Sequence, residues 1–458
     1  MPLPALGSAV TRALQAARET RCVEIGPGVL GRTPAVFRQF FPAKPALVIA
    51  DAHTFAVAGG AVLNALRQAG CACREPFIFA DPPLWASNEN VLDLEVALAG
   101  HEAVPVAVGS GTINDLAKLA AHRARRPYMA VATAASMDGY TAFGASITHN
   151  GSKQTFACPA PLAVIADLDV IAAAPVEMNA AGYADLLAKI PAGADWLLAD
   201  ALGVEAVHPS AWEIVQGGLR AAVADPAGVP GADPATIRQL TEGLLLSGFA
   251  MQSAQSSRPA SGAEHQFSHL WDMQHHMQQG RTPFHGFKVG IGTLAVAALY
   301  EQLFTLDIQG WAVDACCARW PGEAACDEAV RARFRESNLI VVALQETRAK
   351  WIDAAALRAQ LQTLRRVWSG LRERLCRQLI PFSQLKAMLA AAGAPVEPEQ
   401  IGISRERLRV SFRQAYFLRR RFTVLDLAVR CGMLESCLAH IFGPSGPWPI
   451  SPSSRPIR

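Results

Sequence analysis

Residues 104–123 read VPVAVGSGTINDLAKLAAHR, and this stretch decides the fold. An apolar run of strand type, Val104–Val108, leads directly into the small residues Gly109–Thr112. A helical pattern over about Ile113–Arg123 follows them. A strand, a tight turn of small residues and a helix, in this order, are the building block of α/β folds with a parallel sheet.

The same alternation extends over the first third of the chain. Further strands are predicted at Cys22–Ile25, Ala46–Ala50, Pro76–Ala80 and Tyr128–Ala132, and a helix is predicted over about Thr54–Ala69 with Gly70 as its C-terminal cap. From about Pro175 onward the pattern is helical and rich in Ala and Leu. We therefore expect an α/β Rossmann-like domain over residues 1–170, an all-α domain over 171–442, and a disordered Pro- and Ser-rich tail over 443–458.

Length and composition limit the class of protein. The 458 residues predict two or three domains, and a hydrophobic content of 51% with 18% charged residues excludes a disordered chain. The 42 Lys and Arg against 39 Asp and Glu give a net charge of +3, without the strong basic excess of a nucleic-acid-binding protein. Ten cysteines without any C-x-x-C pair argue against a zinc ribbon.

The sequence also lacks the patterns of export and membrane insertion. The first residues, MPLPALGSAVTRALQAARET, contain no basic segment followed by a long apolar core. The apolar run Leu162–Ala174 holds two aspartates and is too short to cross a bilayer. We therefore expect a cytoplasmic protein without a membrane span.

The loop Gly109–Thr112 is a candidate phosphate-binding turn. Small residues let backbone N–H groups approach a phosphate, and the following helix N-terminus favours an anion. The spacing is neither G-x-G-x-x-G nor that of a Walker A loop. An ordinary strand–turn–helix corner is the alternative, and the residues alone leave both open.

Two further groups of polar residues follow predicted strands. Asp51 ends the Ala46–Ala50 strand, where a carboxylate can hold an adenosine ribose and disfavour a 2′-phosphate, or can simply cap a helix. The loop Thr133–Ser136, followed by Asp138 and Gly139, can hold a nicotinamide ribose or a substrate hydroxyl. The alternative for this loop is an Asx-type turn.

The helical part supplies a candidate metal site. His265 and His269 are four residues apart and share one helix face. Asp185 lies in an otherwise apolar helical stretch, where an unpaired carboxylate would be costly. Together with His285, Asp185 and His265 give two imidazoles and one carboxylate with an open position, the pattern of a catalytic metal site. The alternative is an ion pair of Asp185 with Lys189.

The order and spacing of these motifs resemble the sn-glycerol-1-phosphate dehydrogenase family in its AraM-like branch. That family belongs to the superfamily of iron-containing alcohol dehydrogenases, glycerol dehydrogenase and dehydroquinate synthase. The resemblance runs from about Cys22 to Phe442, and its motifs are Gly109–Asp115, Thr133–Ser136 with Asp138-Gly139, Ala163–Ile171, Ala181-Gly182 with Asp185, and His265 through His285-Gly286. It implies a Rossmann-like N-terminal domain, a helical C-terminal domain and an active site in the cleft between them.

The resemblance also implies roles for individual residues. It implies that Asp138, Asp185 and His269 act on the substrate as catalytic residues, and that Asp185, His265 and His285 bind one divalent metal. Zinc is the first expectation for this metal, with nickel or iron as alternatives. NAD(P) would be held by Asp51 and by the residues of two loops, namely Gly109, Gly111, Thr112, Ile113, Asn114, Asp115, Thr133, Ala134, Ala135 and Ser136.

The chain departs from the family pattern at two positions. Ala142 stands where members often have a serine that contacts the cofactor, and Phe287 stands where they often have a glutamate. The three implied metal ligands are all retained. Outside the motifs, His275 and His276 are expected to be exposed helix residues, and Arg405–Arg421 is expected to form either an interface or a solvated helix.

These features predict a metal-dependent, NAD(P)-linked oxidoreductase that interconverts dihydroxyacetone phosphate and sn-glycerol 1-phosphate, or a similar polyol phosphate. We expect a homo-oligomer that acts on a small phosphorylated polyol or ketone, with Lys288 and the Ser136–Gly139 backbone as candidate phosphate donors. Two alternatives stay open: a dehydroquinate-synthase-like lyase that uses NAD transiently, and a non-catalytic relative. Residues 256–292 offer the lyase few cations, namely Arg258, Arg281 and Lys288.

Overall fold

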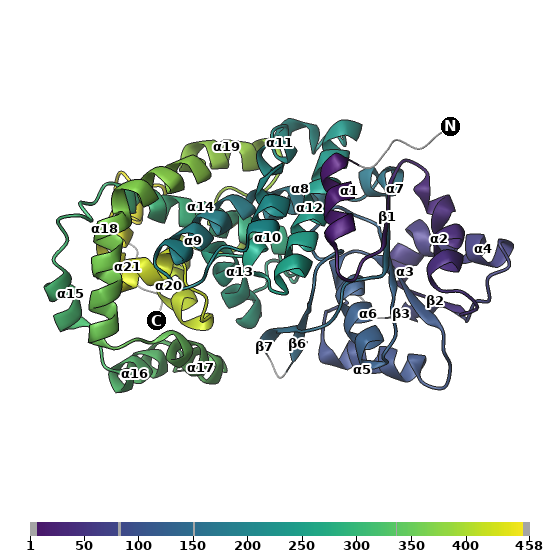
Figure 1. The fold of residues 1–458 in the computed structure, drawn as a ribbon, viewed down its shortest axis with the longest axis horizontal. Helices are drawn as coiled ribbons and strands as arrows, with labels where there is room; N and C mark the ends of the chain where they lie inside the picture. The colour runs from purple at the N-terminus through teal and green to yellow at the C-terminus, as the bar shows by residue number, and fades with distance from the viewer. Residues whose placement is uncertain (1–6, 81–83, 150–151, 336, 452–458) are drawn as a thin grey trace. The chain divides into compact units, whose positions relative to one another are not determined.

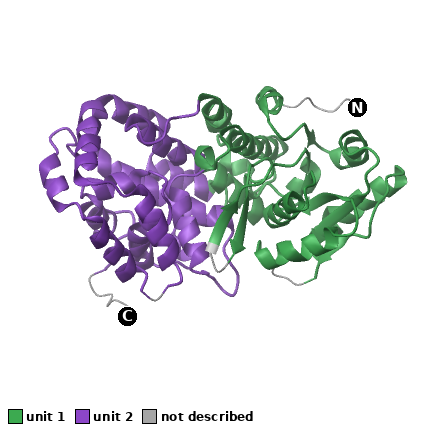
Figure 2. Ribbon diagram, turned by 60° about the horizontal axis from the view of Figure 1, so that its bottom comes forward, with its two compact units in different colours: residues 1–187, 209–260, 391–394 green, residues 188–208, 261–390, 395–458 purple. Residues whose placement is uncertain are grey.

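The computed structural model describes residues 7–80, 84–149, 152–335 and 337–451 (Figure 1). The chain divides into two compact units, coloured separately in Figure 2. Unit 1 comprises residues 1–187, 209–260 and 391–394, and unit 2 comprises 188–208, 261–390 and 395–458. The chain passes between the units several times. The predicted boundary at residue 170 therefore marks the end of the strand-forming part of the chain and not the border between the units.

Unit 1 is built on a six-stranded parallel sheet in the order β1-β8-β5-β4-β2-β3. Its strands are β1 (Cys22–Gly26), β2 (Ala46–Asp51), β3 (Phe77–Phe79), β4 (Val104–Gly109), β5 (Met129–Ala132) and β8 (Ala163–Asp167). A separate antiparallel hairpin joins β6 (Ala145–His149) to β7 (Ser152–Phe156). The predicted parallel sheet is confirmed, whereas its strand β8 and the hairpin are missing from the prediction.

The remaining elements are helices (Figure 1). Those of unit 1 are α1 (Ser8–Ala16), α2 (Thr33–Phe40), α3 (Ala52–Thr54), the π-helical η2 (Phe55–Gly59), α4 (Gly60–Gln68), α5 (Asn88–Leu98), α6 (Gly111–Arg123), α7 (Leu168–Ala172), α8 (Val176–Leu187), α10 (Pro209–Gln216), α11 (Leu219–Ala222) and α12 (Pro234–Ala254). Those of unit 2 are α9 (Lys189–Ala201), α13 (Ala263–Met273), α14 (His285–Phe304), α15 (Val313–Arg319), α16 (Glu323–Arg333), α17 (Ile340–Lys350), α18 (Ala354–Gln378), nearly all of α19 (Phe382–Ala391), α20 (Arg405–Ala415), the short η6 (Tyr416–Leu418), α21 (Val424–Arg430) and α22 (Leu434–Ile441).

The apolar runs of the sequence form the middle of the sheet. Every residue of β4 and β5 is buried, as expected for parallel strands that are covered on both faces. On one face, sheet residues such as Val106 and Ile165 pack with residues of α2 and α4. Because the strand order reverses at β2 and crossovers are right-handed, α4 and α6 cover opposite faces.

The reversal of strand order positions the candidate cofactor residues. β3 lies on one side of β2, whereas β4, the next strand in the chain, lies on the other side. In parallel sheets such a reversal opens a crevice at the carboxyl ends of the strands, where ligands bind. Asp51 ends β2 and Gly109 ends β4, so two predicted cofactor positions flank this point.

The first strand of the sheet pairs with the last. β1 forms one edge and pairs with β8, with Gly26 opposite Asp167. The Asp167 carboxylate accepts hydrogen bonds from the backbone N–H groups of Gly28 (3.2 Å) and Leu30 (2.7 Å). Gly28 has φ +65°, a conformation that other residues rarely adopt. These bonds fix the turn after β1 against the end of β8.

The predicted disordered tail is wrong for its first part. Trp448 is 0% exposed, and its backbone N–H donates to the carbonyl of Ile441 (3.2 Å) at the end of α22. Its ring lies 5.4 Å from that of Phe382, centroid to centroid. A composition rich in Pro and Ser hid this one large apolar anchor, which packs residues 443–451 onto unit 2. The rest of the predicted tail, residues 452–458, lies outside the described residues.

The expectation that His276 is an exposed helix residue is wrong. It is 6% exposed and follows α13 rather than lying on a helix, and its Nε2 lies 2.6 Å from the carbonyl oxygen of Ile401. Arg407 donates to its Nδ1 (2.8 Å). Burial lowers the pKa of His276. The exposed His275 next to it matches the expectation of exposure but not of a helix.

The sequence analysis did not consider the apolar helix α14. By length and composition alone, α14 is long and apolar enough to cross a membrane. However, 78% of its most apolar window is buried inside the protein. That burial is the pattern of a core helix.

Candidate functional site

The loop after β4 leads into the N-terminus of α6. Ser110 is the N-cap residue and, within the described part of the chain, its side chain forms no capping hydrogen bond. The first N–H groups of α6 therefore have no intrahelical partner. A Cβ built on Gly109 would lie 2.6 Å from the Ile113 side chain, which favours glycine there. Unpartnered amides at a helix N-terminus are suited to a phosphate.

Tyr140 joins this loop to the one that follows β5. Its hydroxyl lies 2.8 Å from the carbonyl oxygen of Ala134 and 3.3 Å from that of Gly109. Burial raises the pKa of Tyr140, so the hydroxyl keeps its proton and remains a donor. The backbone N–H of Thr133 also donates to Gly109 (3.3 Å). The two predicted cofactor loops are thus held side by side, by a tyrosine that the sequence analysis did not single out.

Lys118 and Asn114 hold the segment that follows. Lys118 is 1% exposed, and its Nζ donates to three carbonyl oxygens, those of Gly139 (2.9 Å), Ala142 (3.0 Å) and Gly144 (3.0 Å). The Asn114 side chain donates to Gly139 (3.1 Å) and accepts from the Tyr128 hydroxyl (3.1 Å). Because the Asn114 side chain forms hydrogen bonds within the protein, its predicted contact with the cofactor would have to come from its backbone.

Asp115 is also engaged within unit 1. Its Oδ2 accepts from the backbone N–H of Ser146 (3.1 Å) in β6, and its Oδ1 lies 3.6 Å from Lys118 Nζ. Burial raises the pKa of Asp115, and the neighbouring Lys118 charge opposes this shift. The carboxylate therefore anchors the hairpin next to the candidate cofactor loop.

Asp51 forms the helix cap that the sequence left as an alternative. Its Oδ1 accepts from the backbone N–H (2.7 Å) and the hydroxyl (2.9 Å) of Thr54. The backbone N–H of Asp51 in turn donates to the Thr54 hydroxyl (3.1 Å), which completes a capping box at α3. Of the two carboxylate oxygens these bonds use Oδ1 alone, so within the described residues Oδ2 is left to accept from a ribose. Capping and cofactor binding are therefore compatible at this residue.

Helix α8 brings Asp185 against the loop after β5. A Cβ on Gly182 would overlap the carbonyl oxygen of Ala135, so the close approach requires glycine. The Asp185 carboxylate, 0% exposed, accepts from the backbone N–H of Asp138 (3.2 Å). Asp138 in turn accepts from the Ser247 hydroxyl (2.8 Å) of α12. Two of the predicted catalytic residues thus lie together, and Ser247 is a partner that no sequence motif indicated.

The two histidines of the predicted metal set lie on antiparallel helices of unit 2. His265 Nδ1 lies 2.8 Å from the carboxylate of Glu264, which is 0% exposed. His285 begins α14, and its Nδ1 lies 3.3 Å from the Ser268 hydroxyl of α13. The His265 and His285 rings are 5.4 Å apart, centroid to centroid. Partners on Nδ1 orient both rings.

The start of α13 is fixed from a distant part of the chain. The buried carboxylate of Asp195, on α9, accepts from the backbone N–H of Ala263 (2.7 Å), from that of Val424 (2.9 Å) and from the Tyr300 hydroxyl (2.7 Å). A Cβ on Gly292 of α14 would overlap the carbonyl oxygen of Glu264, so α13 and α14 also meet at close range. No local sequence signal marks Asp195.

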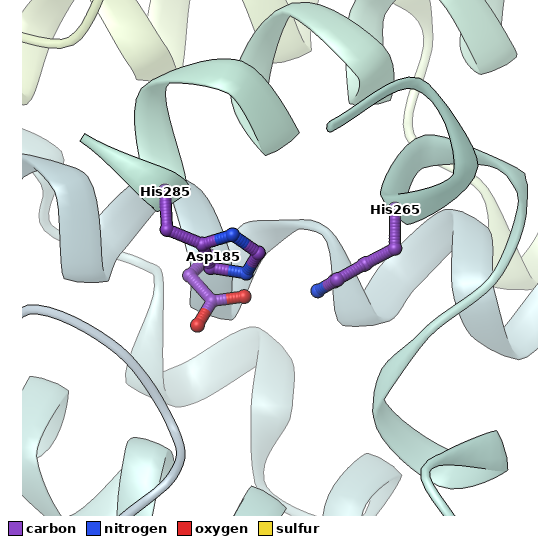
Figure 3. Close-up of side chains that lie close together, drawn as sticks. All are labelled: Asp185, His265 and His285. Atoms are coloured by element: carbon purple, nitrogen blue, oxygen red, sulfur yellow. The ribbon is translucent and has the colours of Figure 1, made fainter. Parts of the chain in front are cut away.

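Asp185, His265 and His285 together form a candidate metal-binding group. Each offers one ligand atom, and these atoms all lie within 4.8 Å of one another. Figure 3 shows the His265 ring pointing toward the Asp185 carboxylate and the His285 ring. The three residues predicted as metal ligands are therefore brought together. Lys189, the alternative partner of Asp185, is 0% exposed at the start of α9 and stays an alternative.

The remaining predicted residues lie close to this group or serve elsewhere. The rings of His269 and His265 are 6.3 Å apart, centroid to centroid, and Arg419 donates to His269 Nε2 (3.2 Å). Lys288, a predicted phosphate donor, instead forms an ion pair with Asp272. Phe287 packs edge-on against Phe284, with the two ring centroids 5.5 Å apart.

Comparison with known proteins first gives the class. Residues 24–175 match the family model of iron-containing alcohol dehydrogenases. Among solved structures, glycerol dehydrogenase from Schizosaccharomyces pombe superposes with a TM-score of 0.58 at 15% identity, over 92% of this chain and 90% of that chain. A likeness at this identity shows the fold, which is the one found in this class of dehydrogenases.

Relatives in sequence then give the family. Glycerol-1-phosphate dehydrogenase (NAD(P)+) from Geobacillus stearothermophilus is 30% identical over 381 residues, which cover 82% of this chain and 85% of the relative. The enzyme of the same name from Halalkalibacterium halodurans is 37% identical over 260 residues, which cover 56% of this chain and 64% of the relative. The chain belongs to the glycerol-1-phosphate dehydrogenase family.

Proposed function

We propose that this chain is a metal-dependent, NAD(P)-linked oxidoreductase that interconverts dihydroxyacetone phosphate and sn-glycerol 1-phosphate, or a similar polyol phosphate. The observation that carries this proposal is the convergence of Asp185, His265 and His285 in a chain of this family. The name shared by the relatives supports the dehydrogenase over the lyase alternative.

The donor group fits a divalent metal by its chemistry. Two imidazole nitrogens and one carboxylate oxygen are typical ligands of zinc, and they also suit nickel and iron. Glu264, beside His265 Nδ1, favours the tautomer that presents Nε2 as the ligand atom and raises the basicity of that ring. When bound, the cation would supply a Lewis acid that stabilises negative charge on the substrate oxygen. Zinc is our first proposal, with nickel or iron as alternatives.

The carboxyl edge of the sheet fits a dinucleotide. The uncapped N-terminus of α6 offers backbone N–H groups to the pyrophosphate, since Gly109 and Gly111 keep that corner small. Asp51 Oδ2 would accept from the adenosine ribose, and the loop Thr133–Ser136 would hold the nicotinamide ribose. The bound nicotinamide would supply or accept the hydride.

Three residues are assigned to the substrate. Asp138, oriented by the Ser247 hydroxyl, would accept from a substrate hydroxyl. His269 is our candidate for moving the proton between substrate and solvent, because an imidazole changes charge near neutral pH. Asp185 completes the set, since its carboxylate is both a metal ligand and a neighbour of the Asp138 backbone.

The proposal also covers the compartment, the oligomeric state and the substrate class. We propose that the enzyme acts in the cytoplasm as a homo-oligomer on a small phosphorylated polyol or ketone. Light scattering coupled to gel filtration measures the oligomeric state and would reject this part if a monomer were found at micromolar concentration.

The central test is an assay of NADH oxidation with dihydroxyacetone phosphate and added Zn²⁺ or Ni²⁺. Steady oxidation of NADH, lost when a chelator removes the metal, is the expected result. Release of phosphate from a sugar phosphate without net change in NADH would support the lyase instead. No turnover with any phosphorylated polyol or ketone, in protein shown to contain metal, would overturn the proposal in favour of a non-catalytic relative.

A further inference from the structure

Arg419 is a cation that reaches the helix face carrying the candidate metal ligand. It directly follows η6 and is half-buried, and its Nη2 donates to His269 Nε2 at 3.2 Å. His269 lies one helical turn after His265 on α13, and the two rings face the same side with centroids 6.3 Å apart. The guanidinium therefore lies close to the residue that we assign to substrate.

Arg419 forms no direct ion pair among the described residues, although the Glu346 carboxylate, which pairs with Arg420, partly opposes the effect of burial on the pKa of Arg419. The next residue, Arg420, forms an ion pair with Glu346, and Arg413 forms one with Glu435. Within the described residues, Arg419 has no carboxylate within 4 Å and donates a hydrogen bond only to His269. Burial lowers the pKa of Arg419, which reflects the cost of holding this charge away from water. A half-buried guanidinium without a direct ion-pair partner is stabilised when an anion binds.

Lys288, which the sequence analysis named as a candidate phosphate donor, already has an ion-pair partner. Lys288 is 2% exposed and forms an ion pair with Asp272, so its charge is balanced inside the protein. Arg421, two residues after Arg419, donates to the carbonyl oxygen of Ser261 (2.6 Å) and helps to hold the segment before α13. Arg419 thus combines a charge that has no direct ion-pair partner with a position beside His269.

We propose that Arg419 binds the phosphate monoester of the substrate and so selects phosphorylated over unphosphorylated ketones. The planar guanidinium carries five N–H groups, of which His269 takes one, and its fork matches two oxygens of a phosphate. Binding there fixes the substrate next to His269, the residue that we assign to proton transfer. This inference rests on the proposed function and names the group that reads the phosphate.

The test compares two ketones in the metal-loaded enzyme. We expect Arg419→Met to lower kcat/KM for dihydroxyacetone phosphate by about 100-fold, as charged hydrogen bonds of this kind are worth. The rate with dihydroxyacetone, which has no phosphate, should fall by a much smaller factor, because that reaction loses only the hydrogen bond from Arg419 to His269. Arg419→Lys, which keeps the charge but loses the fork, should recover part of the loss. The matched control is Arg420→Met, because Arg420 is exposed and paired with Glu346.

Two results would overturn the inference. An equal loss with both ketones, together with a shifted pH profile, would mean that Arg419 only positions His269. A loss seen as a raised KM for NADPH but not for NADH would assign the phosphate to the cofactor. Metal content of every variant, measured by mass spectrometry, should equal that of the wild type.

A binding measurement separates this inference from the proposed function. Calorimetric titration of the zinc-loaded protein with sn-glycerol 1-phosphate should show binding that Arg419→Met weakens about 100-fold and Arg420→Met leaves unchanged. If the wild type binds this ligand through Arg419 but never oxidises NADH, the anion site stands and the oxidoreductase proposal fails. If both variants bind equally well, the inference about Arg419 is wrong.

Discussion

In unit 1 the candidate cofactor residues lie at the ends of β2 and β4, at the start of α6 and in the loop after β5, and bonds to main-chain groups hold these segments. Asp185 of unit 1 lies on helix α8, and His265 and His285 of unit 2 also lie on helices, which in unit 2 are held by distant side chains. Lys118 and Tyr140 bind carbonyl oxygens of the loops after β4 and β5. On α13, Asp195 fixes the helix start, and Arg419 reaches His269 across 150 residues of sequence. The segments of unit 1 are therefore held through their backbone, and the helices of unit 2 through side chains from distant parts of the chain.

The largest effect expected from breaking unit 2 comes from His265→Ala. The donor group falls from three ligands to two, so metal content and NADH oxidation with dihydroxyacetone phosphate should fall together by more than about 1000-fold in rate. Metal analysis of the purified variant and the absorbance assay measure the two quantities. His275→Asn is the control, because His275 is exposed and has φ +51°, which asparagine tolerates. Full metal content in the His265 variant would refute the assignment of ligands.

A pair of glycine substitutions tests both regions in the same way. A Cβ on Gly182 would overlap a carbonyl in the loop after β5, and a Cβ on Gly292 would overlap one in α13. Each change to alanine should lower the free energy of unfolding by about 3 kcal/mol. Urea unfolding followed by circular dichroism measures this difference.

Gly370→Ala on α18 is the matched control for both, because no atom lies within 4 Å of its added Cβ. That variant should gain about 0.5–1 kcal/mol of stability, as alanine favours the helix. If the Gly182 variant proved as stable as the wild type, the close approach of α8 to the loop would not be needed for folding.

Substitutions of Glu264 test whether a neighbouring side chain orients the metal ligand His265 before the metal binds. Removal of the carboxylate beside His265 Nδ1 in Glu264→Ala should weaken zinc affinity by about 10- to 100-fold. Glu264→Gln keeps an acceptor oxygen and should lose less. Competition with a zinc-binding dye measures the affinity. Equal loss in both variants would indicate that the charge, and not the hydrogen bond, is what matters.

Asp51 tests the loops of unit 1. Asp51→Asn keeps an oxygen that can cap α3 but removes the charge, so the preference for NAD over NADP should fall by about tenfold while stability changes little. Asp51→Ala should in addition lose about 1 kcal/mol of unfolding free energy with the cap. Steady-state kinetics with both cofactors decides the point. An unchanged preference in both variants would leave Asp51 with the capping role alone.

The smallest effect concerns pH. Burial lowers the pKa of His276 below its ordinary value of 6.5, so the unfolded chain binds a proton more readily than the folded protein. Stability from this residue is therefore present above about pH 6.5 and lost as the pH falls through the lower folded value. The unfolding free energy of the wild type should fall between pH 7 and pH 5. In His276→Gln, whose side chain can still donate to Ile401, this fall should be reduced, by an amount below about 1 kcal/mol. The same decline in both proteins would assign the pH effect to other groups.

Local patterns in the sequence predicted the part of the fold that depends on neighbours in the chain. Apolar runs ending in small residues gave β2, β4 and β5, because buried parallel strands need such runs. They did not predict α5 or the β6–β7 hairpin, whose apolar residues are mixed with polar ones. The apolar run of β8 was also not recognised as a strand. Trp448 was hidden in a Pro- and Ser-rich segment, although one buried indole is enough to anchor it.

The candidate site shows the same limit. The spacing of His265 and His269 placed both on one face of a helix, and the ligand set with Asp185 and His285 rested on the resemblance and on the cost of a buried carboxylate. Tyr140, Lys118, Asp195 and Arg419 could not be predicted in this way. Each of these side chains contacts residues far from it in sequence or backbone carbonyl groups. Contacts of these two kinds produce no pattern of residue type or spacing in the sequence.

The pairing of β1 with β8 has a consequence for how the chain is made. β1 leaves the ribosome early, but its only neighbour in the described sheet ends at Asp167, some 140 residues later. During synthesis the first strand must therefore wait, with its edge open, while the inner strands assemble. Such late closure of a parallel sheet is slow and leaves apolar surface open to misassociation, so chaperone dependence and yield should respond most strongly to changes in β8.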